Sequence, residues 1–234
     1  MQIVILCGGF ATRLGNIAKN TPKSMIEIEG KPFLEYQIEQ LKKQSIIDII
    51  LCVGHLYKKI QQYFDDGKKF GVNITYSYDG SKPLGPIGAL KKAEPLLEDI
   101  FFIMYGDSFL SLDFKKAYQH FLQQKKHALM TIYENHDKYD KSNVVSKDGK
   151  IIKYNGKKTE DMIYVDYGAS IFRKKILELV PQNTYYTTKD LFIKLVEKNE
   201  LSAFEVKKRF YHIGTYEGLE EFRKNAKKLL QNQS

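Results

Sequence analysis

The chain has 234 residues, of which 43% are hydrophobic and 28% charged, and its formal net charge is +9. This length and composition fit a globular protein with a sizeable core. No apolar run approaches the roughly 18 residues that a membrane-spanning helix needs, and the start lacks the basic leader and small-residue cleavage site of a secretory signal. We therefore expect a cytoplasmic protein with no membrane partner.

The positive charge is spread along the chain. Much of it lies in Lys-Lys pairs, from residues 42–43 to residues 227–228, and no basic arm stands out. A small anionic substrate explains this charge as well as a polynucleotide does, so we predict no nucleic-acid partner. Cys7 and Cys52 lie in apolar segments without histidines at ligand spacing, which predicts free, buried thiols.

The first segment is an apolar run that ends in two glycines. Residues 2–7 are mostly apolar and β-favouring, which predicts a buried strand, and Gly8-Gly9 follow. The glycines allow a sharp turn whose N–H groups can surround an anion such as phosphate. Arg13 and Lys23 add positive charge nearby. Such a motif is more often a simple turn, and neither the dinucleotide fingerprint nor the P-loop is present.

The first half of the chain alternates between strands and helices. Strands are predicted at 2–7, 46–53, 73–78 and 100–105, and helices after Pro32, around residues 60–64 and from residue 90 onward, behind a loop at 79–89. This alternation predicts an α/β fold with a Rossmann-like, mixed, mostly parallel sheet and helices on both faces. Ligands bind such sheets at the carboxyl ends of the strands, where Asp107 and the loop from Gly8 to Lys23 would lie.

The second half is richer in strands. They are predicted at 128–133, 143–146, 150–154, 162–172, 201–206 and 210–213. An Asp148-Gly149 turn would join two of them in a hairpin. No linker or internal repeat interrupts the chain, so we expect a single domain over residues 1–234. Its nucleotide-binding part would span about 1–125 and its sugar-binding part about 126–234.

Two helix starts carry capping signals. Thr187 and Asp190 have the spacing of a capping box, in which each residue's side chain bonds the other's backbone N–H, for a helix through Val196. Thr215 would cap a terminal helix. The apolar face of that helix would carry Leu219, Phe222, Ala226 and Leu230.

Short motifs occur in a fixed order along nearly the whole chain. They are Leu6 to Leu14, Pro22 to Met25, Lys31 to Tyr36, Pro83 to Leu90, Tyr105 to Ser108 and Ile213 to Thr215. Together they resemble the signature of the sugar-1-phosphate nucleotidyltransferases, also called nucleoside-diphosphate-sugar pyrophosphorylases. The short length and Asp166-Tyr167-Gly168 are most similar to bacterial mannose-1-phosphate and D-glycero-D-manno-heptose-1-phosphate guanylyltransferases.

The resemblance implies a reaction. The phosphate of a sugar 1-phosphate attacks the α-phosphorus of a nucleoside triphosphate in line, and pyrophosphate leaves. Such a transfer needs positioning and charge neutralisation more than a general base. GTP and a mannose- or manno-heptose-type acceptor are favoured. Two alternatives stay open: the same reaction with UTP, CTP or dTTP and another phosphorylated acceptor, or a non-catalytic regulator on the same fold that binds the nucleotide or sugar.

The resemblance also implies residue roles. Arg13 would neutralise the leaving pyrophosphate, Lys23 would bridge the reacting phosphates, and Asp107 would hold Mg²⁺. The nucleotide would be bound by Leu6, Gly8, Gly9, Phe10, Ala11, Thr12, Pro83, Gly85 and Gly88. The sugar phosphate would be bound by Gly106, Lys157, Lys158, Asp166 and Gly168. A homo-oligomer is possible.

Structural roles for these residues stay open beside the functional ones. The alternatives are surface charge for Arg13, Lys23, Lys157 and Lys158, a turn for Asp107, a tight loop for Gly85 and Gly88, and a paired strand carboxylate for Asp166.

Three positions depart from the family pattern. Pro86-Ile87 stand where Thr-Gly is common, Ala11 stands where many members have Gly, and His212 replaces the aspartate that often supplies a second metal contact. Mg²⁺ prefers oxygen ligands to imidazole. The metal would therefore depend on Asp107, phosphates and water, or on a further carboxylate such as Asp166.

Overall fold

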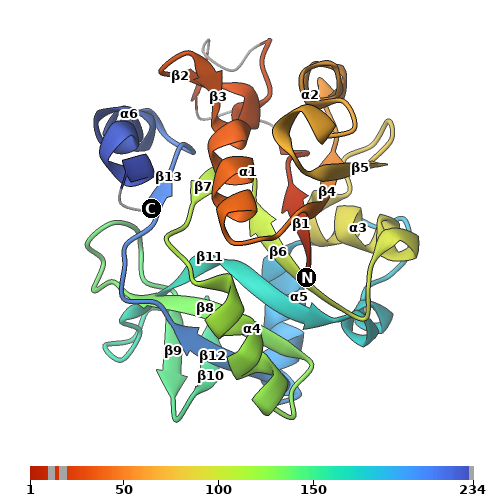
Figure 1. The fold of residues 1–234 in the computed structure, drawn as a ribbon. Coiled ribbons are helices and arrows are strands. Elements are labelled where there is room, and N and C mark those ends of the chain that lie inside the picture. Colours follow the sequence, from red (N-terminus) through yellow and green to blue (C-terminus); the bar gives the residue numbers. More distant parts are fainter. Residues whose placement is uncertain (10–13, 16–19, 232–234) are drawn as a thin grey trace.

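A mixed nine-stranded sheet forms the centre of the molecule (Figure 1). The computed structural model describes residues 1–9, 14–15 and 20–231. The strand order in the sheet is β5-β4-β1-β6-β11-β8-β12-β10-β9. Helices cover both of its faces, so the predicted α/β fold is confirmed.

The N-terminal half of the sheet is parallel. β1 (Gln2–Leu6) lies between β4 (Asp48–Val53) and β6 (Ile100–Tyr105), and β5 (Asn73–Tyr78) pairs with β4 at the edge. β1, β4 and β6 are apolar because side chains on both of their faces are covered, whereas β5 at the edge alternates between exposed and buried residues. Their shared direction brings four carboxyl ends to one edge of the sheet, where polar residues of distant segments can meet.

The C-terminal half contains both strand directions. The long strand β11 (Tyr164–Arg173) runs antiparallel between β6 and β8 (Ala128–Glu134), and β12 (Leu201–Glu205) runs parallel to β8. The predicted hairpin is present as β9 (Val144–Lys147) and β10 (Lys150–Tyr154). β11 therefore joins the parallel half to the remaining strands.

Two hydrophobic clusters fill the space between the sheet and its helices. On one face lie α1 (Phe33–Lys43), α2 (Tyr57–Phe64) and α4 (Phe114–Gln123). On the other lie α3 (Gly85–Lys92) and α5 (Thr188–Glu197). Because side chains alternate along a strand, β1 sends Ile3 and Ile5 into the first cluster and Val4 into the second.

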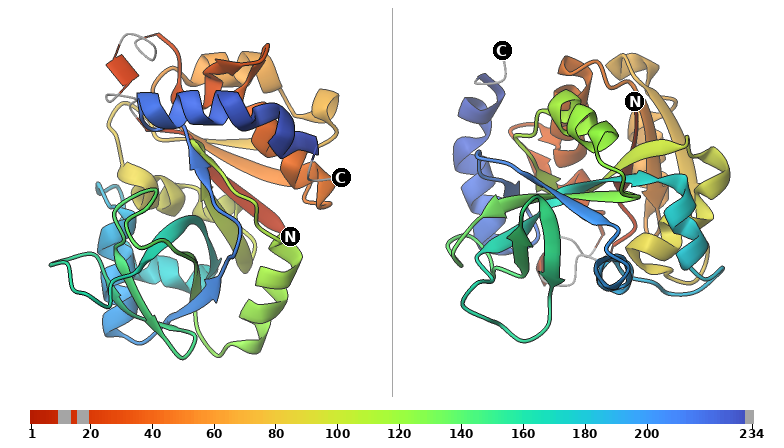
Figure 2. Two further views of the ribbon diagram at one scale, coloured as in Figure 1. Left: turned by 90° about the vertical axis from the view of Figure 1, so that its left-hand side faces the viewer. Right: turned by 90° about the horizontal axis from the view of Figure 1, so that it is seen from below.

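The last helix, α6 (Tyr216–Gln231), packs against α1 (Figure 2). Its Phe222 ring lies 5.0 Å from the Phe33 ring, 5.8 Å from the Tyr36 ring and 5.3 Å from the Phe109 ring, measured between centroids. Leu14, from the first loop, is 5% exposed and belongs to this third cluster. The end of the chain thus packs onto a residue near its beginning.

Short elements complete the fold. β7 (Ser108–Phe109) pairs with β13 (Tyr211–His212), and β2 (Glu27–Ile28) pairs with β3 (Lys31–Pro32). Single turns of 3₁₀ helix lie at η2 (Lys23–Met25), η3 (Lys68–Phe70) and η4 (Glu94–Leu96), with a longer one at η5 (Lys174–Leu179). No helix within the described ranges is long and apolar enough to cross a membrane.

Two helices differ from the sequence prediction. α3 begins at Gly85 inside the segment predicted as a loop, because Pro86 fits the first turn of a helix. α4 was not predicted, although Asp113 caps it by accepting a hydrogen bond from the Lys116 N–H at 2.9 Å. The capping box of Thr187 and Asp190 is present as predicted.

Candidate active site

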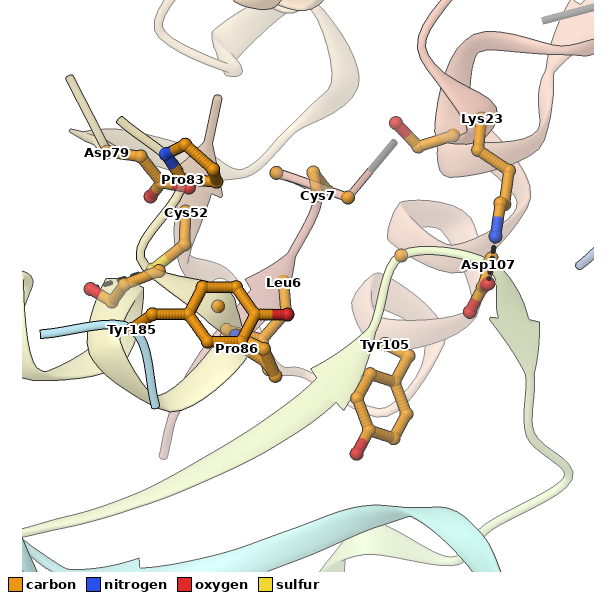
Figure 3. Close-up of a pocket in the computed structure, with 16 residues that line it drawn as sticks. Leu6, Cys7, Lys23, Cys52, Asp79, Pro83, Pro86, Tyr105, Asp107 and Tyr185 are labelled. Carbon is orange, nitrogen blue, oxygen red and sulfur yellow. Dashed lines mark hydrogen bonds and ion pairs between the residues drawn. The ribbon is translucent and has the colours of Figure 1, made fainter. Parts of the chain in front are cut away.

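A cavity of about 260 Å³ lies at the carboxyl ends of the parallel strands (Figure 3). It is lined by Leu6, Cys7, Gly8, Gly9, Lys23, Ser24, Cys52, Asp79, Pro83, Gly85, Pro86, Ala89, Tyr105, Gly106, Asp107 and Tyr185. The lining therefore includes residues that follow β1, β5 and β6, as expected for a ligand site in an open α/β sheet.

Lys23 and Asp107 form an ion pair on one side of the cavity (Figure 3). The Lys23 Nζ donates to the Asp107 Oδ2 at 2.9 Å, and the two side chains are 16% and 28% exposed. Among the described residues of the lining, Lys23 is the one with a cationic side chain. A pair of this kind can exchange its internal contact for contacts to a phosphate and a metal ion.

The turn that carries Asp107 is fixed from several sides. The Gly106 N–H donates to the Leu6 carbonyl at 3.1 Å, and the Ile213 N–H donates to the Asp107 carbonyl at 2.9 Å. A Cβ atom on residue 106 would lie 2.7 Å from the Cys7 Sγ and 3.1 Å from the Leu6 carbonyl oxygen. Gly106 therefore allows β1 and β6 to end close together, which places Asp107 beside the first loop.

A buried glutamine of α1 also holds this turn. The Gln37 Nε2 donates to the Tyr105 carbonyl at 2.9 Å and to the Ser108 carbonyl at 2.7 Å, so it bonds the backbone on both sides of Gly106 and Asp107. Gln44, the residue that follows α1, bonds the Leu112 carbonyl and the Phe114 N–H in a similar way. Gln37 is thus a positioning residue for the Asp107 carboxylate.

We expect Gln37→Leu to lower the free energy of unfolding by about 1–3 kcal/mol, because two buried carbonyl groups lose their donor. It should also raise the Mg²⁺ concentration needed for half-maximal activity, since the Asp107 turn keeps its backbone hydrogen bonds but loses the two from Gln37. Thermal unfolding and Mg²⁺ titration of turnover measure these effects. Gln44→Leu is the matched control: it should lower stability without changing the Mg²⁺ requirement. Equal Mg²⁺ requirements in the two variants would contradict a positioning role.

Asp79 lies on the other side of the cavity, directly after β5 (Figure 3). A Cβ atom on residue 8 would lie 2.6 Å from its Oδ2. Burial raises the pKa of Asp79 to about 6, and the positive charge of Lys92 opposes this shift. Asp79 was predicted only as part of a loop, although its position directly after a strand is the kind of signal that predicted Asp107 at the site.

Gly85 and Gly88 bring a later segment over α3. Gly85 has a φ of +70°, and Cβ atoms at the two positions would lie 2.7 Å from the Tyr186 carbonyl and 2.5 Å from the Thr184 carbonyl. The same segment carries Tyr185, which lines the cavity. Gly85 itself belongs to the lining, whereas Gly88 lies outside it and serves close packing.

Four residues that were predicted to bind the sugar phosphate lie outside the lining of this cavity. The Lys158 ammonium donates to Asp137, to the Ser142 carbonyl and to the Met162 carbonyl, at 2.7, 3.2 and 3.0 Å. Lys157 is exposed. Gly106 is the member of this predicted set that lines the cavity.

Asp166 and Gly168 form an irregular turn within β11. Gly168 has a φ of +100°, and its N–H donates to the Asp166 Oδ1 at 3.0 Å. The strand's register with β8 shifts between Asp166 and Ser170. Burial raises the pKa of Asp166 to about 6 even though its hydrogen bonds oppose the shift. The Asp166 carboxylate therefore has a structural partner of its own.

Part of the predicted nucleotide site lies outside the described residues, namely Phe10, Ala11, Thr12 and Arg13. The same holds for the Leu230 side chain, which was predicted on the terminal helix. The cavity is lined, as predicted, by Leu6, Gly8, Gly9 and Pro83.

Ser24 also lines the cavity but was not predicted to do so. It is 2% exposed, and its Oγ has no hydrogen-bond partner among the described residues. Its position next to Lys23 was the available signal.

The site offers few protein ligands to a metal. No cluster of three or more His, Cys, Asp or Glu side chains in the described ranges is placed to hold an ion. His212 pairs with Ser108 through β13 and β7, and its Nδ1 accepts a hydrogen bond from the Gly214 N–H at 3.3 Å. Mg²⁺ commonly binds one or two carboxylates, with phosphate oxygens and water as its other ligands. Asp107, on the cavity wall, fits that pattern.

The fold and the cavity define a class of phosphate-handling α/β transferase, and comparison with known proteins identifies its family. The sequence profile described as nucleotidyl transferase matches residues 2–228. The chain belongs to this family, and the family predicted from its motifs is confirmed.

Several relatives have known names. A D-glycero-α-D-manno-heptose 1-phosphate guanylyltransferase of Campylobacter jejuni is 33% identical over 192 residues, which cover 82% of this chain and 78% of the relative. A UTP–glucose-1-phosphate uridylyltransferase of Synechocystis is 33% identical over 217 residues, which cover 84% of this chain and 55% of the relative.

Solved structures have the same fold. HddC from Yersinia pseudotuberculosis complexed with GMP-PN superposes with a TM-score of 0.81 at 26% identity, covering 96% of this chain and 99% of HddC. A protein described as a glucose-1-phosphate thymidylyltransferase from Bacillus anthracis superposes with a TM-score of 0.85 at 23% identity, covering 97% of this chain and 95% of that one. The second likeness is evidence of the fold alone.

Proposed function

We propose that the protein transfers a guanylyl group from GTP to a mannose- or manno-heptose-type sugar 1-phosphate, giving a GDP-sugar and pyrophosphate. The observation that carries this proposal is the Lys23–Asp107 pair in a cavity at the strand ends, 2.9 Å apart. The Campylobacter relative and HddC, whose structure holds a guanine nucleotide analogue, favour GTP and a manno-heptose acceptor. The Synechocystis relative favours the alternative donor UTP.

The side chains would act by binding and orienting the phosphates. Backbone N–H groups from Gly8 to Ala11 would hold the triphosphate, and Arg13 would neutralise the leaving pyrophosphate. Lys23 would leave Asp107 and bridge the attacking phosphate and the α-phosphate, which lowers the repulsion between the two anions. Asp107 would hold Mg²⁺, which supplies further neutralisation of phosphate charge when bound. Removal of the metal by EDTA should therefore abolish turnover.

The remaining predictions concern the whole chain. We propose a nucleotide-binding part at about 1–125 and a sugar-binding part at about 126–234. In the second part, Asp166 and Gly168 would lie near the sugar, and Lys157 would supply charge for its phosphate. Lys158 would first have to leave its three acceptors. The cytoplasmic location, the absence of nucleic-acid and membrane partners, and a homo-oligomer remain predictions.

The test is pyrophosphate release from the purified full chain with Mg²⁺. GTP, UTP, CTP and dTTP are each combined with mannose 1-phosphate, D-glycero-α-D-manno-heptose 1-phosphate and glucose 1-phosphate. We expect the highest kcat/KM with GTP and one of the two manno-configured acceptors, because these match the named relatives. A maximum with UTP and glucose 1-phosphate would support the alternative donor. No turnover in any combination would favour the non-catalytic regulator.

A further inference from the structure

The two ends of the cavity differ in chemistry. Figure 3 shows Lys23 and Asp107 together on one side, and Asp79 with Pro83 and Cys52 on the other, with Cys7 between them. A nucleotide whose phosphates lie at Lys23 would therefore direct its base toward Asp79. This argument rests on the proposed function, because it takes the ligand to be a nucleoside triphosphate.

The Asp79 carboxylate has acceptor capacity that the described residues do not use. The backbone of Asp79 is fixed, since its N–H donates to the Val53 carbonyl at 2.9 Å and its carbonyl accepts from the Lys92 Nζ at 3.1 Å. Between described residues, no hydrogen bond or ion pair ends on the carboxylate oxygens. A partly buried carboxylate without donors is unfavourable. A donor group on a ligand would remove that penalty.

Gly8 and Gly54 leave the space that the Asp79 carboxylate occupies at the cavity wall. A Cβ atom on Gly8 would lie 2.6 Å from the Asp79 Oδ2, and one on Gly54 would lie 3.1 Å from it. A side chain at either glycine would therefore displace the carboxylate from this position. Neighbouring lining residues are apolar, among them Leu6, Pro83 and Pro86. Apolar walls with one polar group at their end suit a flat base that is recognised along one edge.

The chemistry of the bases identifies which one this carboxylate fits. Guanine carries two adjacent donors on one edge, N1–H and the 2-amino group, and a carboxylate can accept both through its two oxygens. Uracil and thymine present one N–H between two carbonyl acceptors. Cytosine and adenine present an amino group beside an unprotonated ring nitrogen, which would repel the second carboxylate oxygen.

We propose that Asp79 selects guanine by accepting hydrogen bonds from its N1–H and its 2-amino group. Asp79 is then a specificity-determining residue of the nucleotide site. Although burial raises its pKa to about 6, the side chain is still mainly ionised at pH 7.5, so it acts as an acceptor on both oxygens under ordinary assay conditions.

The test is equilibrium binding of GTP, ITP and UTP to the full chain by calorimetry at pH 7.5. ITP lacks only the 2-amino group of guanine. We expect the wild type to bind GTP about 10–100-fold more tightly than ITP, the range of one hydrogen bond to a charged group. In the Asp79→Asn variant, the affinities for GTP and ITP should differ by about threefold or less, because the amide loses one acceptor. An unchanged ratio in the variant would overturn the proposal, as would a wild type that does not distinguish GTP from ITP.

Two controls separate recognition from folding. Asp48→Asn changes a carboxylate at the opposite end of the neighbouring strand, where it bonds the Asn73 side chain at 2.9 Å, and should leave the GTP/ITP ratio unchanged. Asp79→Asn should keep or raise Tm, since it removes a desolvated charge. A lower Tm with an intact ratio would mean that Asp79 is structural. Turnover with UTP but equal binding of GTP and ITP would refute guanine selection and leave nucleotidyl transfer in place.

Discussion

Asp107→Asn should lower kcat for pyrophosphate release by about 100–1000-fold, the usual effect of removing one charge-stabilising group from an active site. The amide has the shape of the carboxylate but not its charge, so it binds Mg²⁺ poorly. It can no longer form an ion pair with Lys23, although the turn retains the backbone bonds of Gly106 and Ile213. Steady-state kinetics over a range of Mg²⁺ concentrations measure the effect.

A surface pair supplies the control for this variant. Asp66 and Lys68 also form an ion pair at 2.9 Å, but their side chains are 51% and 80% exposed, and neither lines the cavity. Asp66→Asn should leave kcat within about twofold of the wild type, as exposed pairs contribute little. If Asp107→Asn kept normal kcat and a normal Mg²⁺ requirement, Asp107 would be a turn residue and not a metal ligand.

Lys23→Met should reduce kcat/KM by about 1000-fold while KM for the nucleotide changes less, because a charge on the reacting phosphates acts mainly in the transition state. The variant keeps an apolar side chain of similar length, and loss of a partly exposed pair lowers stability by about 1 kcal/mol or less. Single-turnover and steady-state measurements with GTP separate the chemical step from binding.

Lys31→Met is the matched control for Lys23→Met. Lys31 is 24% exposed and pairs with Glu39 at 2.5 Å, outside the cavity. We expect a small loss of stability and unchanged turnover. The double variant Lys23→Met with Asp107→Asn should be about as slow as the slower single variant, because groups that act on the same phosphates are not additive. Additive losses would mean that the two residues act on separate steps.

Local patterns predicted the elements that they themselves determine. The strands at 73–78 and 100–105 were predicted with the observed bounds, since each is an uninterrupted strand-forming run between breakers. The capping box at Thr187 and Asp190 needs only two residues at a fixed spacing. By contrast, α4 was missed even though Phe114, Ala117 and Phe121 have helical spacing and enter the first cluster. The helix is short, and polar residues between these apolar positions hide that apolar face in a reading of composition.

The sequence motifs predicted which segments form the site, but they did not predict the contacts between those segments. Lys23 and Asp107 are 84 positions apart in sequence. They were predicted to lie near each other because the carboxyl ends of parallel strands meet at one edge of the sheet. Gln37 could not be found in this way, and the position of Asp79 after a strand did not reveal its role. The role of Gln37 depends on a buried contact with backbone carbonyls, and that of Asp79 depends on the glycines opposite it. Such information lies in the packing of distant segments.

The position of Leu14 in the third cluster has a consequence for synthesis of the chain. Leu14 shares one cluster with Ile213, Leu219 and Phe222, which are synthesised long after it. Domains fold from the N-terminus as they leave the ribosome, but this cluster cannot be completed until β13 and α6 have been made. Leu14, next to the first strand of the sheet, therefore reaches its full set of apolar neighbours later than β1 and β4 can pair.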